Sequence, residues 1–135
     1  MTARELVQVI ERAGGSLCLS PDGQKIRCEL VEDVDETVEL LHQHRDEVIA
    51  ILRARRAELI GHWLHDFCTK NEYGEGLGRV LCREFCAWAR AEVDVLEFLG
   101  ALRAAGFAVD DDGYVHGLIL RADDEAAQLY RRRVN

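Results

Sequence analysis

A turn sequence at residues 20–23, Ser-Pro-Asp-Gly, constrains the fold of the first part of this chain more than any other feature. It holds the only proline of the 135 residues. Proline presets the first turn position, aspartate favours the second, and glycine accepts the left-handed backbone that a bulged hairpin turn needs. Segments 17–19 and 25–28 on either side carry apolar residues at strand spacing. The sequence therefore predicts a short β-hairpin. The side chains expected to share one face of it are Leu17, Leu19, Ile26 and Cys28.

Helical patterns stand on both sides of this hairpin. Thr2 and Glu5 have the spacing of a reciprocal capping box at the start of a first helix. After an acidic connection, apolar residues at three-, four- and seven-residue spacings predict one long helix that runs to about Arg56, with an early break near Leu41. Helix, hairpin and helix make a complete αββα domain, which we expect over residues 1–57.

Residues 58–135 predict a second, mainly helical domain. The expected elements, in order, are helix 58–68, loop 69–78, helices 80–88 and 95–106, strands 107–109 and 114–120, and a terminal helix over 123–133. The loop is expected because that segment holds three glycines. Three helices followed by a hairpin is the order of a winged helix, so the whole chain is expected to be α+β.

Charge and cysteine usage narrow the class of protein. The net charge is −8, with 8 basic and 11 acidic side chains in residues 1–57 and 9 and 14 in residues 58–135. Neither part is a basic lobe, which speaks against simple nucleic-acid binding, since phosphate contacts need a local excess of Lys and Arg. No apolar run approaches the twenty or so residues of a membrane span. Five cysteines without regular spacing favour reduced thiols in the cytoplasm.

Three segments of the first domain resemble the TubC-type N-terminal docking domain. They are TAREL at 2–6, PDGQKIR at 21–27 and LLHQHRDEVIAIL at 40–52, and the likeness covers residues 2–55. The resemblance implies an αββα fold that forms homodimers. It also implies binding of a short linear tail of a partner protein along the exposed hairpin, typically between modules of nonribosomal-peptide and polyketide assembly lines.

The second domain resembles the winged-helix tail that follows primase–helicase proteins of phage- and plasmid-like elements. Small stand-alone proteins in such neighbourhoods place a docking-like head before a tail of this kind. The positions that match the core pattern of the tail are Leu81, Phe85, Trp88, Phe98, Leu102, Gly106 and Phe107.

The hairpin is the expected binding surface. A two-stranded sheet leaves at least one edge unpaired, and a free edge can accept an extended peptide unless a dimer partner closes it. The expected partner-binding residues are Leu17, Leu19, Gln24, Lys25, Ile26 and Arg27. The basic pair, Lys25 and Arg27, favours an acidic or C-terminal tail, and the apolar stripe of the closing helix is expected to hold a homodimer. This predicts a non-enzymatic adaptor that needs no cofactor.

Four nitrogen and sulfur donors, His65, Cys68, Cys82 and Cys86, could in principle meet across two helices as a tetrahedral zinc site requires. The last two, however, lie one turn apart in an apolar helix, and free cysteine packs well as a small hydrophobic side chain. Core packing is therefore the expected role, and no metal is assigned. No arrangement of Ser, His, Cys or Asp resembles a known catalytic motif either.

DNA association by the winged helix is the alternative function. The expected recognition helix, residues 94–103, carries one arginine and two acids, and residues 110–112 at the following turn are all aspartate. These features are poorly suited to base edges and phosphates. The residues that would serve this alternative are Arg103, Arg131, Arg132 and Arg133.

Overall fold

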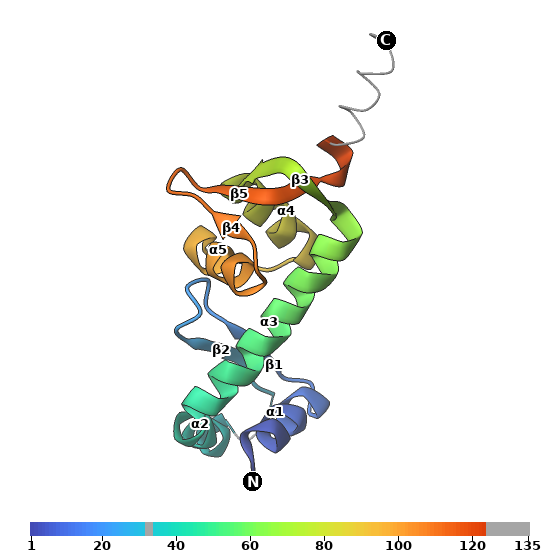
Figure 1. Ribbon diagram of the computed structural model, residues 1–135. Coiled ribbons are helices and arrows are strands. Elements are labelled where there is room, and N and C mark those ends of the chain that lie inside the picture. Colours follow the sequence, from blue (N-terminus) through green and yellow to red (C-terminus); the bar gives the residue numbers. More distant parts are fainter. Residues whose placement is uncertain (32–33, 124–135) are drawn as a thin grey trace, which may run out of the picture. The chain divides into compact units, whose positions relative to one another are not determined.

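The computed structural model describes residues 1–31 and 34–123 (Figure 1). The chain divides into two compact units, unit 1 (Met1–Ala57) and unit 2 (Glu58–Asn135). Each unit has its own hydrophobic core. The architecture is α+β, with a small antiparallel sheet in each unit.

Unit 1 contains α1 (Ala3–Arg12), β1 (Ser16–Leu19), β2 (Ile26–Glu29), α2 (Val34–Gln43) and the first part of α3 (Arg45–Phe67). The capping box of α1 is confirmed: the Glu5 amide donates to the Thr2 hydroxyl at 3.1 Å, and the Thr2 amide donates to the Glu5 carboxylate at 3.3 Å. The expected break in the second helical segment is also present, after Gln43. The expected end at Arg56 is wrong, because α3 continues to Phe67. Arg, Ala and Glu around Arg56 are good helix formers, and nothing there terminates a helix.

The hairpin has the predicted register and faces. Leu17 pairs with Cys28 and Leu19 with Ile26, so these four side chains share one face. Gly23 adopts a φ of 73°, the left-handed conformation that the turn sequence predicts. Leu19 is buried, and Leu17 and Ile26 pack against the same core. The hairpin is therefore held to the helices by its apolar face.

The core of unit 1 uses the apolar stripe of α3 within a single chain. Val48 is fully buried and Leu52 is 5% exposed, packed with the buried face of α1. Val48 and Leu52 are thus already covered inside unit 1, and the homodimer expected from the stripe stays a prediction.

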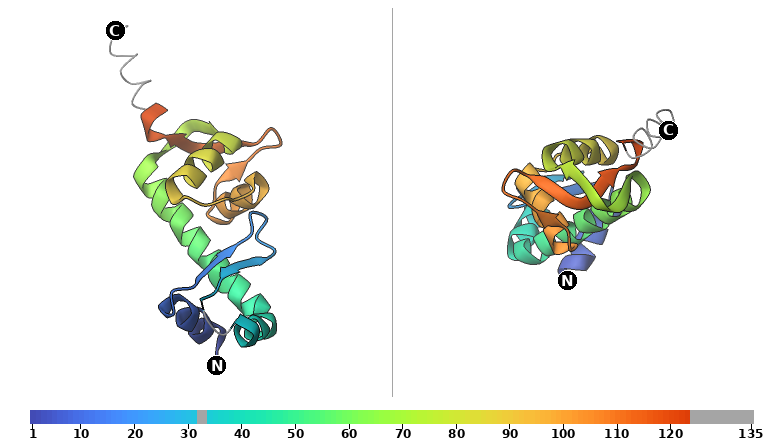
Figure 2. Two further views of the ribbon diagram at one scale, coloured as in Figure 1. Left: turned by 180° about the vertical axis from the view of Figure 1, so that it is seen from behind. Right: turned by 45° about the horizontal axis from the view of Figure 1, so that its top comes forward.

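Unit 2 contains the end of α3, β3 (Cys68–Leu77), α4 (Gly78–Ala89), α5 (Val95–Ala104), β4 (Ala108–Val109) and β5 (Tyr114–Leu120). The antiparallel sheet has the order β3-β5-β4. Figure 2 shows α4 and α5 against one face of this sheet. The expected loop at 69–78 is wrong, because most of that segment is strand β3. Its pairing with β5 is interrupted only by a register shift between Lys70 and Glu75.

Close packing explains the glycines that made β3 look like a loop. Gly74, Gly76 and Gly78 are absent from the positive-φ residues of the described chain. A Cβ atom at Gly76 would lie 2.9 Å from Leu81, and one at Gly78 would lie 2.6 Å from Leu99 and 2.8 Å from the Gly113 carbonyl oxygen. These glycines are required by approaching side chains and backbone, not by turn geometry.

The core of unit 2 is built around aromatic rings. Trp63 of α3, Phe85 of α4 and Phe98 of α5 are almost completely buried. The two phenylalanines stack with ring centroids 5.6 Å apart, and Trp63 meets each of them edge-on at about 6 Å. Within the described residues, none of the helices combines the length and the hydropathy that a membrane span requires.

Candidate functional site

The turn of the unit 1 hairpin is locked by side-chain hydrogen bonds. The Asp22 carboxylate accepts from the Ser20 hydroxyl at 2.5 Å and from the Gln24 amide at 3.0 Å. These bonds, that to Ser20 first, lower the pKa of Asp22 below its ordinary value of 3.8. The Ser20 hydroxyl in turn accepts from the Lys25 amide at 3.0 Å. The position of Lys25 is thus fixed by the turn itself.

Three arginines of α3 bind backbone carbonyls of the same turn. Arg45 donates to the Gln24 oxygen at 2.7 Å, Arg53 to the Gly23 oxygen at 3.1 Å, and Arg56 to the Ser20 oxygen at 3.0 Å. This role of the three arginines was not predicted from the sequence. Spacings of eight and eleven residues place all three on one helix face, which is the signal that could have revealed it.

A groove of about 390 Å³ lies between β2 and α2. Its lining combines apolar side chains with basic ones, and none of its seven lining residues is acidic. The lining residues are Lys25, Ile26, Cys28, Val38, Leu41, His42 and Arg45.

The groove runs along a strand edge that is unpaired in the described chain, because β2 pairs only with β1. The Ser20 amide bonds the Lys25 oxygen across the hairpin at 2.8 Å, which sets the alternation of the ladder. By that alternation the backbone groups of Ile26 and Cys28 point away from β1. The residues that line the groove therefore also offer backbone donors and acceptors to an added strand.

The six predicted partner-binding residues fall into three pairs: two line the groove, two lie on the core side of the hairpin, and two do neither. Lys25 and Ile26 line the groove. Leu17 and Leu19 belong to the core side of the hairpin, and Leu19 is buried.

The other two predicted residues do not line the groove. Gln24 is exposed and supplies the backbone oxygen that Arg45 binds. Arg27 pairs with Cys18 on the opposite face of the hairpin. The contribution of α2 was not predicted, because the sequence identifies residues 38–42 as helical but does not place them beside β2.

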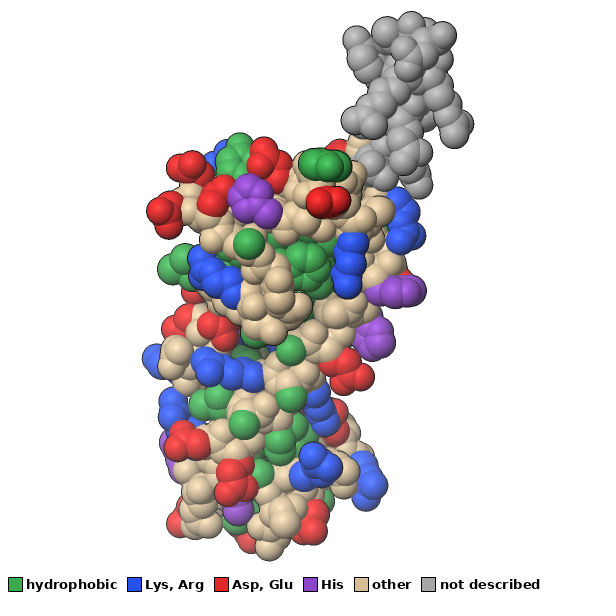
Figure 3. All heavy atoms as spheres, in the orientation of Figure 1, with side chains coloured by type: hydrophobic (Ala, Val, Ile, Leu, Met, Phe, Trp, Pro, Cys, Tyr) green, Lys and Arg blue, Asp and Glu red, His purple; other side chains and the backbone are tan. Residues whose placement is uncertain are grey.

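The residues expected for nucleic-acid binding do not form a described site. Arg103 is exposed in the last turn of α5, and Arg131, Arg132 and Arg133 lie outside the described residues. The outer side of α5 also presents Leu96, which is 81% exposed. On the face drawn in Figure 3, the coloured Lys and Arg side chains alternate with acidic ones and form no continuous basic surface.

The aspartates between β4 and β5 build a turn, as predicted. Asp110 accepts from the amides of Asp112 and Tyr114, each at 3.0 Å, and contacts the His116 ring at 2.8 Å. The bond from Tyr114, followed by that from His116, lowers the pKa of Asp110. The Asp110 carboxylate is thus used in the hydrogen bonds that form the turn.

The cysteines of unit 2 pack as core side chains. The Cys82 thiol donates to the Val93 carbonyl at 3.4 Å and lies 4.0 Å from the Cys86 sulfur. Burial raises the pKa of Cys68 to about 11, and burial together with Cys86 raises the pKa of Cys82 to about 12. His65, at the end of α3, is exposed and contacts Asp66. In the part of the chain that the structure describes, no three His, Cys, Asp or Glu side chains are grouped to hold a metal ion.

The groove between β2 and α2 is thus the strongest candidate for a functional site in unit 1. Comparison with known proteins adds no family to this geometry: no family model, curated protein or solved structure matches the chain.

Proposed function

We propose that unit 1 is a non-enzymatic docking domain of the αββα type that binds a short, extended segment of a partner protein between β2 and α2. The observation that carries this proposal is the groove of about 390 Å³ beside the unpaired edge of β2. An extended segment added at this edge gains main-chain hydrogen bonds from Ile26 and Cys28, and its side chains reach the groove.

The charge of the groove lining indicates which residues the partner segment carries. Lys25 and Arg45 line the groove and no carboxylate does, although the chain carries a net charge of −8. Ile26, Val38 and Leu41 supply an apolar lining between them. The favoured partner segment therefore combines acidic and apolar residues. Exposed ion pairs contribute about 0.2–1 kcal/mol each, so most of the affinity must come from strand pairing and apolar burial.

The test begins with selection of binders from a displayed library of ten-residue peptides, using the full-length protein. The best peptide is then titrated into ¹⁵N-labelled protein. We expect enrichment of acidic and apolar residues, with amide shifts concentrated at β2 and α2. Selection of no peptide, or shifts that map away from these two elements, would reject the groove.

Two charge reversals on neighbouring residues sharpen this test. Lys25→Glu should weaken peptide binding, because Lys25 lines the groove, whereas Arg27→Glu should change it little, because Arg27 lies on the opposite hairpin face. Both variants are first compared with the parent by thermal unfolding. Equal loss of binding in both variants would contradict the placement of the peptide.

For unit 2 we propose a winged-helix-like domain that makes a second protein contact. The order α3-β3-α4-α5-β4-β5 and the sheet order β3-β5-β4 support this class of fold. The exposed Leu96 and the interspersed surface charge favour a protein partner.

DNA association of unit 2 is the second candidate function, and the element order is the observation in its favour. Fluorescence anisotropy with a generic duplex at rising salt separates the two functions. Binding that weakens steeply with salt would indicate phosphate contacts, and absence of binding at low salt would leave protein docking.

A further inference from the structure

An aromatic cluster reaches the surface of unit 2 between α3 and α4. Trp63 is 1% exposed, but its neighbours Phe67 and Trp88 are 43% and 39% exposed. The rings of Phe67 and Trp88 lie 5.9 Å apart at 61° to each other. Two large aromatic side chains on adjacent helices, each left partly in water, are typical of a surface that another molecule covers.

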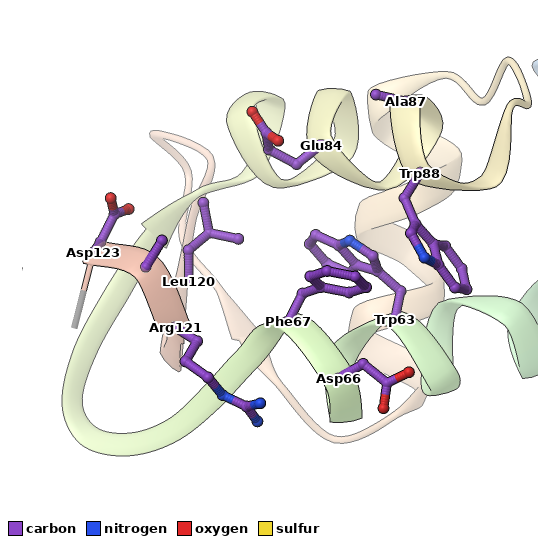
Figure 4. Close-up of a pocket in the computed structure, with 10 residues that line it drawn as sticks. Trp63, Asp66, Phe67, Glu84, Ala87, Trp88, Leu120, Arg121 and Asp123 are labelled. Carbon is purple, nitrogen blue, oxygen red and sulfur yellow. The ribbon is translucent and has the colours of Figure 1, made fainter. Parts of the chain in front are cut away.

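These rings line a pocket of about 500 Å³ that also extends to the end of β5 (Figure 4). Figure 4 shows the rings of Trp63, Phe67 and Trp88 gathered between the two helices, with Glu84 and Asp66 on opposite sides of them in this view. The charged residues that line the pocket are Asp66, Glu84, Arg121 and Asp123.

The charges around the pocket favour a cation. Arg121, the one basic residue among them, donates to the His65 carbonyl at 3.1 Å, and Asp66 contacts the His65 ring. Within residues 1–31 and 34–123, the carboxylates of Glu84 and Asp123 form no hydrogen bond or ion pair. Two carboxylates without a partner among the described residues therefore line the pocket together with the aromatic rings.

We propose that this pocket binds the side chain of an arginine in a basic segment of a partner protein. The flat guanidinium stacks on the exposed indole of Trp88, where the ring face carries negative potential, and the carboxylates of Glu84 and Asp123 elsewhere in the lining favour its positive charge. An anionic ligand is disfavoured by the same two carboxylates. The site is independent of the groove in unit 1 and of the function proposed for it.

The test uses full-length ¹⁵N-labelled protein, whose two tryptophans give two indole N–H signals. The probes are acetyl-Gly-Arg-Gly-amide and the same tripeptide with citrulline, which has nearly the same shape without the charge. We expect the arginine probe to shift the Trp88 indole signal in a saturable way and to bind about two- to fivefold more tightly than the citrulline probe. Trp88→Leu assigns the signal.

Carboxylate variants test the charge requirement. Glu84→Gln with Asp123→Asn should weaken the arginine probe to the level of the citrulline probe, and Glu92→Gln, on a residue that does not line the pocket, serves as the control. Equal binding of both probes, or absence of any shift at Trp88, would overturn the proposal. If Arg131→Gln with Arg132→Gln and Arg133→Gln moves the Trp88 signal without any probe, the occupant is this chain's own terminus, and the assignment to a partner is wrong.

Discussion

At the scale of single residues, Asp22 makes the stability of the hairpin turn depend on pH. Its carboxylate accepts two hydrogen bonds that are stronger in the charged form, and its pKa is lowered from 3.8. A group whose pKa is lower in the folded than in the unfolded state stabilises the fold above the unfolded pKa. That contribution is lost as pH falls through the lowered folded pKa.

We therefore predict that Asp22→Ala destabilises unit 1 near neutral pH and that its difference from the parent shrinks as the solution is acidified below pH 3.8. Asp22→Asn should be intermediate, because the amide keeps one acceptor oxygen but not the charge. Urea unfolding followed at unit 1 amide signals measures the effect. A difference that stays constant down to pH 2 would show that the carboxylate charge is not what stabilises the turn.

Single residues also show which parts of the site can be predicted from the sequence. Lys25 and Ile26 were predicted for partner binding and line the groove, because both stand at the end of a recognisable turn. Arg27 was predicted with them, yet it lies on the other hairpin face. Local sequence gives strand alternation, but which face meets α2 depends on the tertiary packing of a distant helix.

At the scale of elements, β3 shows why its glycines led to the wrong prediction of a loop. Its glycines predicted a loop on the assumption that glycine serves turns, whereas the structure uses Gly76 and Gly78 to admit Leu81 and Leu99. The need for a small residue arises from side chains that are distant from it in the sequence or in a different element. By contrast, the ends of α1 and α5 were predictable, since capping and C-terminal glycine signals are local.

The start of α4 offers a prediction at this scale. Gly78→Ala should destabilise unit 2 by about 1–3 kcal/mol through overpacking, because its Cβ meets Leu99 and the Gly113 oxygen. Gly100→Ala on α5 is the matched control: nothing lies within 4 Å of that Cβ, and alanine in a helix is favoured over glycine by about 1 kcal/mol. Chemical denaturation of the two variants should give opposite signs. Destabilisation by both would mean that helix propensity does not govern Gly100.

At the scale of the whole molecule, the two hydrophobic cores share no residue. One is formed by buried side chains from Ala3 to Leu52, the other by buried side chains from Ile60 to Leu118. Both cores contain residues of α3, a single helix where the apolar pattern predicts two that are joined without Gly or Pro at residues 53–56. The order of helices and strands was otherwise largely predictable, because periodicity and turn signals are local, while the pairing of β3 with β5 was not.

The final prediction follows from these separate cores. Leu52→Asp places a charge where the leucine is 5% exposed, next to the buried face of α1. Loss of apolar burial and of solvation for the carboxylate should cost at least about 3 kcal/mol, which is enough to unfold a unit of this size. The matched variant in the other core is Phe98→Ala, which removes a ring stacked on Phe85.

In ¹⁵N spectra, Leu52→Asp should collapse the amide signals of Met1–Ala57 toward the unfolded region, while the indole signal of Trp63 and the amides of β3 and β5 stay dispersed. Phe98→Ala should do the reverse. If either variant unfolds both sets of signals together, the two cores form one cooperative unit in spite of having no residue in common. Peptide docking at the groove would then raise the unfolding temperature of unit 2 as well as unit 1, because a ligand of the folded state stabilises the whole cooperative unit.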